Sequence, residues 1–365
     1  MARKVTVVIS QGQSANPEKR GLEEALVGAL LMDHNVEVTV IPHLYDLAPG
    51  STGMLCLEGI TGDMIVASWL FPRAAHWTLD RGGIKGHFGQ TLLESEDEDE
   101  DDEAAEAEDE ADDKPRVGGR DLPNRAIYHL HLAAQKGPEP FIAEIKRILS
   151  EASVQTVGLM GWIGGSPKPD SLARYLDPGK TNGQARPGPA ESPAPTNGSS
   201  PDNATTGAIE PIRIDETPAR RWYPVIDFSR CTNCMECIDF CLFGVYGVDA
   251  AETILVEQPD NCRKGCPACS RVCPENAIIF PQHKTPAIAG SAVESAGGLK
   301  IDLSQLFGAP SAIEIAAQER DTELVAAGRD AVGLAVGVPK RQANKPDEPK
   351  DELDDLIDQL DDLDL

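Results

Sequence analysis

The sequence has no apolar run long enough to cross a membrane. Its longest one, near residues 64–71, is far shorter than the roughly 20 residues that a helical crossing needs. The N-terminal segment MARKVTVVIS has basic residues, but its apolar run is short and is followed by a polar stretch from Ser10, which is not the pattern of a secretory signal. We therefore expect a cytoplasmic protein without a membrane span.

The sequence also lacks clustered basic residues. It has 33 Lys and Arg, scattered along the chain, against 60 Asp and Glu, and its formal net charge is −27. Nucleic acids and anionic membrane surfaces are bound through grouped Lys and Arg. This charge balance argues against both as partners.

Glycine-rich nucleotide-binding motifs are missing as well. The loop SQGQSANPEKR, residues 10–20, contains neither G-x-G-x-x-G nor G-x-x-x-x-G-K-[ST]. Its small polar residues Ser10, Gly12, Ser14 and Asn16 precede an expected helix and would suit an anion. A plain loop with Ser14 or Asn16 as the helix N-cap explains the same residues.

Strand-like and helix-like segments alternate over residues 1–176. We expect strands at 4–10, 36–42, 63–71, 125–133 and 155–165, and helices at 17–32 and 139–150. This alternation predicts an α/β domain with a mainly parallel sheet. In such sheets ligands bind where the carboxyl ends of the strands meet.

Two polar stretches interrupt the chain. Residues 94–113 hold 15 acidic positions in 20, and we expect a disordered acidic insertion at 94–116 that raises solubility or meets a basic partner. Residues 177–220 are rich in Pro, Gly, Ser, Asn and Thr, which predicts a disordered linker.

The C-terminal part is expected to be partly helical over residues 285–349, with a helix at 311–332. The acidic tail 350–365 carries an amphipathic stripe formed by Leu353, Leu356, Ile357, Leu360 and Leu363. Such a stripe docks on its own domain or, equally well, in a partner's groove.

Eight of the nine cysteines fall into two short runs. The first run is Cys231, Cys234, Cys237 and Cys241, and the second is Cys262, Cys266, Cys269 and Cys273. The first has the spacing C-x2-C-x2-C-x3-C of iron–sulfur ligands. Structural zinc favours paired C-x2-C elements, and disulfides are rare in a reducing compartment. Cys56, in an apolar context, is expected to be a buried, inert thiol.

Residues 222–283 resemble the bacterial-type two-cluster ferredoxins. Two internal repeats, each running strand, cysteine loop, short helix and strand, support the resemblance. It implies a small α+β domain at 221–284, with two [4Fe-4S] clusters whose ligands cross over between the runs. Cluster one would take Cys231, Cys234, Cys237 and Cys273; cluster two would take Cys262, Cys266, Cys269 and Cys241.

The second run departs from the family spacing. Three residues, Arg263, Lys264 and Gly265, separate Cys262 from Cys266 where the family has two, and Gly265 would relax the enlarged turn. In addition, Leu242, not proline, follows Cys241.

Aromatic residues are placed to shield the clusters or to form the core of the domain: Phe228, Phe240, Phe243, Tyr246 and Phe280. Eight carboxylates against four basic residues at 222–283 predict low reduction potentials.

The best candidate for a site in the first domain is the segment 69–89, WLFPRAAHWTLDRGGIKGHFG. Its candidate side chains are Trp69, Arg73, His76, Trp77, Asp80 and Arg81. The loop at 161–169 would lie at the same sheet edge. His129 and His131 alternate along one expected strand and therefore share a face. Metal binding, acid–base chemistry and a structural role are the three alternative interpretations of this pair.

Three functions fit these features. The first is an electron-transfer protein or redox subunit that serves a partner redox enzyme. The second is an oxidoreductase whose α/β domain holds a substrate or flavin and receives electrons from the ferredoxin module. The third is a scaffold with purely structural clusters. Two clusters in one small module favour the first, and no catalytic residue is assigned.

Overall fold

The computed structural model describes residues 5–33, 36–93, 117, 122–153, 210–291 and 310–337. Its described residues fall into two compact units, Met1–Lys146 with Pro211–Leu365, and Arg147–Glu210. Four expected features lie largely or wholly outside the described residues. These are the strand at 155–165, the acidic insertion, most of the linker and the acidic tail.

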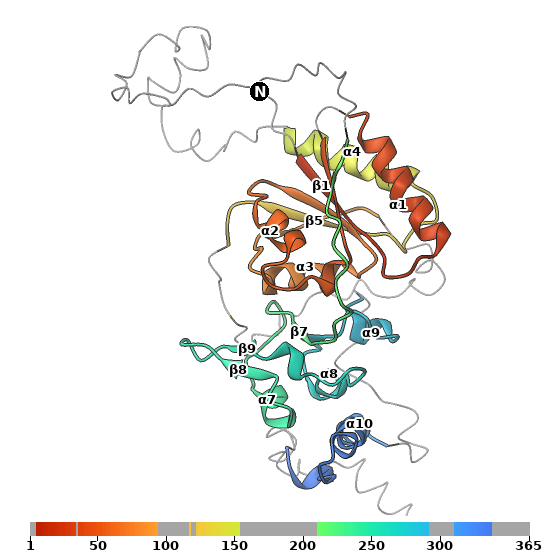
Figure 1. Cartoon of the computed structure of the whole chain (residues 1–365). Helices are drawn as coiled ribbons and strands as arrows, with labels where there is room; N and C mark the ends of the chain where they lie inside the picture. Colours follow the sequence, from red (N-terminus) through yellow and green to blue (C-terminus); the bar gives the residue numbers. More distant parts are fainter. Residues whose placement is uncertain are drawn as a thin grey trace, which may run out of the picture. The chain divides into compact units, whose positions relative to one another are not determined.

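The N-terminal part contains a six-stranded sheet in which every pairing is parallel (Figure 1). The strand order is β4-β5-β3-β1-β2-β6. The strands are β1 (Val5–Ser10), β2 (Val36–Ile41), β3 (Met64–Ser68), β4 (His87–Gly89), β5 (Ala126–His131) and β6 (Ile212–Arg213). The predicted α/β fold class is therefore confirmed.

The central strands are buried on both faces because helices cover the sheet. β3 is buried at all five positions, which explains its continuous apolar sequence MIVAS. The helices are α1 (Pro17–Leu30), α2 (Thr52–Glu58), α3 (Pro72–Arg81) and α4 (Glu139–Ser153). Figure 1 shows α1 on one face of the sheet and α2 and α3 on the other.

Local signals fix where these helices begin. Asn16 caps α1 by accepting the backbone N–H of Glu18, and Pro17 follows at the first helical position, where proline costs no hydrogen bond. Ser51 caps α2 through the N–H of Met54. α3 starts at Pro72, so the strand expected at 63–71 ends earlier, at Ser68.

The linker expected to run to residue 220 ends earlier. β6 pairs in parallel with β2, and the Ile214 N–H extends the pairing to the Val40 carbonyl at 2.9 Å. Arg213 also bonds the Glu24 carboxylate with both guanidinium nitrogens, at 3.0 and 2.7 Å. The chain therefore joins the sheet before it enters the cysteine-rich region.

The cysteine-rich region is a small α+β fold of two similar halves. The first half is β7 (Val225–Ile226), α7 (Glu236–Phe240) and β8 (Tyr246–Val248); the second is β9 (Ile254–Val256), α8 (Ala268–Val272) and β10 (Ile278–Ile279). β7 pairs antiparallel with β10, and β8 with β9. Each sheet therefore contains a strand from both halves, as the internal repeat predicts.

One apolar core extends from the N-terminal sheet into this region. The cluster of buried residues around β3, α2 and α3 also contains Tyr223, Val225 and Ile279. Tyr45 and Tyr223 stack at 4.3 Å between ring centroids and are joined by three hydrogen bonds. The two parts thus share a core and do not meet only through a linker.

The C-terminal segment adds α9 (Pro286–Ala289), α10 (Ala312–Ala326) and a 3-10 turn (Gly333–Ala335). α10 begins with a capping box formed by Ser311 and Glu314, and it ends six residues before the predicted position. Arg271 of α8 bonds both carboxylate oxygens of Glu319 in α10, at 2.9 and 3.0 Å. Among the described helices, none is both long and apolar enough to span a membrane.

Candidate metal centres

The first cysteine loop is folded so that its backbone turns toward its own sulfurs. The Cys231 N–H bonds the Asp227 carbonyl at 2.9 Å and closes the start of the loop. Asn233 and Met235 adopt left-handed conformations, with φ of 56° and 62°. Left-handed residues reverse the direction of successive amides, and the Asn233 N–H lies 3.4 Å from the Cys231 sulfur.

One cavity is lined by cysteines from both runs. Its sulfur-bearing residues are Cys231, Cys234, Cys237 and Cys273. Three come from the first loop, and the fourth comes from the end of α8 in the second half. These are the four cysteines that the ferredoxin resemblance assigns to cluster one.

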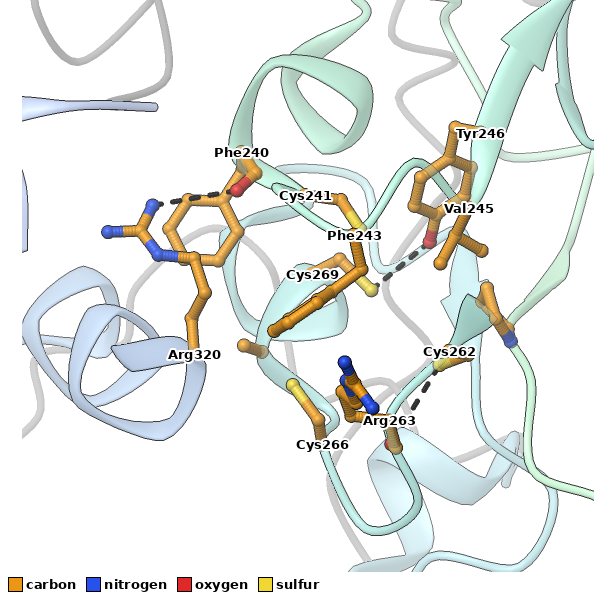
Figure 2. Close-up of a pocket in the computed structure, with 12 residues that line it drawn as sticks. Phe240, Cys241, Phe243, Val245, Tyr246, Cys262, Arg263, Cys266, Cys269 and Arg320 are labelled. Carbon is orange, nitrogen blue, oxygen red and sulfur yellow. Dashed lines mark hydrogen bonds between the residues drawn. The ribbon is translucent and has the colours of Figure 1, made fainter. Parts of the chain in front are cut away.

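A second cavity is lined by the other four cysteines. They are Cys241, Cys262, Cys266 and Cys269. Figure 2 shows them around a common space into which the side chains of Phe243 and Arg263 also project. The two runs thus exchange their fourth cysteine, although the ligand assignment itself stays a prediction.

Hydrogen bonds are donated to several of these sulfurs. The Ala277 N–H lies 3.3 Å from Cys273 Sγ, and the Tyr246 hydroxyl lies 3.1 Å from Cys269 Sγ. Donors to sulfur stabilise thiolate charge and tune a bound metal centre.

Burial raises the pKa of the cysteine thiols. It raises the pKa of Cys266 and of Cys273 to about 11, and it holds that of Cys269 well above the ordinary value. Neighbouring cysteines of the same set raise it further, such as Cys241 beside Cys269. Because metals bind thiolates, loading these sites must release protons.

The donor set and its surroundings fit iron–sulfur clusters. Apolar side chains surround the sulfurs, and none of the nine cysteines forms a disulfide. Four sulfurs around each of two cavities are the donors that a cubane takes, one for each iron.

The enlarged turn between Cys262 and Cys266 is accommodated by glycine. Gly265 has a φ of 93°, a conformation that other residues adopt only with strain. The additional residue leaves the Arg263 guanidinium 5.5 Å from the Phe243 ring centroid, at the cavity wall. The unusual spacing therefore places a positive charge beside the second set of cysteines.

The predicted aromatic shield is present in part. Phe240, Phe243 and Tyr246 line the second cavity. Phe280 is fully buried and stacks on Trp222 with 5.3 Å between centroids, so it belongs to the core. Phe228 contacts Trp77 of α3.

Arg320 of α10 was not among the predicted site residues, yet it lines the second cavity. It is 1% exposed, lies over the Phe240 ring at 4.5 Å and donates to the carbonyls of Val336 and Gly333. In the sequence it is one of several charges on the helix expected at 311–332, so no local signal identifies it. Cys56 of α2 is only partly buried, and burial raises its pKa.

The loop after β1 does not offer a free anion site. Gly12 N–H and Trp69 Nε1 both donate to Glu23 Oε1, at 2.7 and 2.8 Å. Arg20 bonds the same carboxylate and the Gly12 carbonyl. The alternative of a plain loop with Asn16 as the N-cap is the one observed.

The candidate segment 69–89 is divided between several environments. Arg73, His76 and Trp77 line a cavity of about 740 Å³ together with His129 and His131 of β5. Asp80 and Arg81 line a different hollow, and the Arg81 guanidinium lies over the Tyr223 ring at 4.5 Å. The loop at 161–169 lies outside the described residues.

The paired halves and their two sets of four cysteines define a ferredoxin-like iron–sulfur region. In agreement, the chain is 50% identical over 84 residues to an uncharacterized ferredoxin of Methanocaldococcus jannaschii. The match covers 22% of this chain and 56% of that relative, so the chain spans about half the length of the curated relative it matches. No protein-family profile and no solved structure matches the chain.

Proposed function

We propose that the protein is an electron-transfer protein that carries two [4Fe-4S] clusters and relays single electrons to or from a partner redox enzyme. The observation that carries the proposal is the sorting of eight cysteines into two cavities, each with three cysteines of one run and one of the other. This is the ligand pattern of two-cluster ferredoxins. When bound, such clusters supply reversible one-electron chemistry.

The chain's own residues set the conditions for that chemistry. Cys231, Cys234, Cys237 and Cys273 would hold cluster one, and Cys262, Cys266, Cys269 and Cys241 would hold cluster two. Buried apolar side chains keep water away from the sulfurs, while backbone N–H groups and the Tyr246 hydroxyl stabilise their negative charge. The excess of carboxylates in the region opposes reduction, so we expect low potentials.

A redox titration of the anaerobically purified protein, followed by paramagnetic resonance, tests this function. We expect two centres that each take up one electron reversibly, in the lower half of the roughly −700 to +450 mV range known for protein clusters. Clusters that are present but cannot be reduced at any accessible potential would contradict electron transfer and favour the scaffold role.

One observation favours the second candidate, an oxidoreductase that uses its own α/β domain. The cavity of about 740 Å³ is lined by residues of that domain and also by Asp227, Ser229 and Arg230, which directly precede Cys231. A molecule bound there would contact the loop of cluster one.

The acidic tail, whose proposed partner is a helix-binding groove, lies outside the described residues.

A further inference from the structure

The cavity beside the cluster one loop has the size and lining of a small-molecule site. Its volume of about 740 Å³ lies within the roughly 300–1,000 Å³ of typical ligand pockets. Its walls come from α3, β4, β5 and the loop before Cys231. In parallel sheets ligands often bind at the carboxyl ends of the central strands, but here the Gly12 N–H after β1 and the Trp69 Nε1 after β3 both donate to Glu23.

Flat rings form much of the cavity wall. His76 lies 5.0 Å from Phe88 and 5.2 Å from Trp77 between ring centroids, and Phe71 lies 4.7 Å from His131. Phe88 is 50% exposed, which is unusual for a large apolar side chain on a strand. Such walls suit a planar conjugated molecule, which stacks on rings.

A buried polar atom in this wall has no partner among the described residues. His129 is 2% exposed, and its Nε2 lies 3.1 Å from His76 Nδ1, which leaves His129 Nδ1 without a hydrogen bond. Burial lowers the pKa of both rings, so they are neutral near pH 7. Buried polar atoms normally have partners, so the unpaired His129 Nδ1 is a feature of this wall that no described residue satisfies.

The cavity is positive in a strongly negative chain. Arg73 pairs with Asp227 at 2.9 Å, and Arg230 lies 3.8 Å from the same carboxylate. Asp227 is the one carboxylate among the described residues that line the cavity, so two guanidinium groups face a single negative charge. The Arg230 side chain is 31% exposed and is therefore available to an anionic group of a ligand.

We propose that this cavity binds an anionic, planar, conjugated electron acceptor of the flavin mononucleotide kind, with its anionic group at Arg230 and its ring system against Phe88 and Trp77. The proposal rests on the proposed function for its electron source. One electron leaves a reduced cluster and is gained by the bound acceptor, so charge and electrons balance. Cys231 directly follows Arg230, which makes the path from cluster one short.

Titration of flavin mononucleotide into the oxidised, iron-loaded protein tests this site, with flavin fluorescence as the readout. We expect quenching that saturates at one flavin per chain, and riboflavin, which lacks the phosphate, should bind about tenfold more weakly. Arg230→Gln should weaken flavin mononucleotide binding about tenfold and remove the preference over riboflavin. Phe88→Ala should weaken both flavins.

Two matched variants control for nonspecific effects. Arg213→Gln changes an arginine on β6, and Leu55→Ala shortens a residue of α2 that is 56% exposed; both lie away from the cavity and should bind like wild type. Absence of saturable binding, or equal binding by Arg230→Gln and wild type, would overturn the proposal. The titration needs no electron transfer, so lost binding with intact, reducible clusters would leave the proposed function standing.

Discussion

At the scale of single residues, Gly265 lets the enlarged cysteine turn form without backbone strain. Its φ of 93° is unfavourable for alanine, and no atom lies within 4 Å of the place where a Cβ would be. Gly265→Ala should therefore cost about 1 kcal/mol of unfolding free energy through the backbone alone. Gly28→Ala in α1, where a Cβ also meets nothing, should be neutral or stabilising. Equal unfolding free energies for the two variants in denaturant titrations would contradict this.

Arg263, which lies in the same turn, should raise the reduction potential of cluster two. Its guanidinium lies at the cavity wall over Phe243. Removing a nearby positive charge disfavours an added electron, so Arg263→Gln should lower the potential of cluster two by a few tens of mV. Lys264→Gln, a neighbouring charge that does not line the cavity, should shift it less. A redox titration compares them, and identical potentials in Arg263→Gln and wild type would contradict the assignment.

At the scale of elements, the stacked pair Tyr45 and Tyr223 joins the segment after β2 to the strand that enters the cysteine region. The Tyr45 hydroxyl donates to the Tyr223 carbonyl at 2.5 Å and accepts its N–H at 2.6 Å. Tyr45→Phe leaves both buried backbone groups unpaired and should cost roughly 2–4 kcal/mol. Tyr223→Phe removes a single bond, at 2.9 Å, and should cost less. Denaturant unfolding measures both, and the reverse order would contradict the role of this contact.

The same scale shows which elements can be predicted from sequence. Long apolar or periodic segments, such as β1, β2 and α1, were predicted because their pattern is local. The short helix α2 and the three-residue strand β4 were not, because so few residues carry little periodicity. The helix α3 was not predicted either, although its amphipathic pattern and the proline at its first position are local signals. β6 follows only from pairing with β2, which lies some 170 residues earlier in the chain. The ferredoxin resemblance implied the two sets of cysteines, and the segment 69–89 supplied Arg73, His76 and Trp77 of the α3 cavity, whereas Arg320 depends on tertiary contacts.

At the scale of the whole molecule, buried histidines should make stability depend on pH. Burial lowers the pKa of His43 and of His131 to about 4, whereas an unfolded histidine titrates near 6.5. Between these values the unfolded chain binds more protons, so this stabilisation is complete above about pH 6.5 and is lost as pH falls toward 4. Urea unfolding at intervals from pH 7.5 to 5.5 should show a decrease on the order of 1 kcal/mol or more. His131→Gln should flatten that slope; an unchanged slope would contradict the account.

The central claim, that two interlocked sets of cysteines hold two [4Fe-4S] clusters, is tested most directly by anaerobic quantification of iron and sulfide with paramagnetic resonance of the reduced protein. We predict about eight irons per chain and coupled signals in wild type and in Cys56→Ala, whose thiol lies in α2. Cys234→Ala should lose about half of the iron and unfold more easily, because metal supplies much of a small fold's stability. A colourless protein that holds zinc, or equal iron in Cys234→Ala and wild type, would contradict the claim.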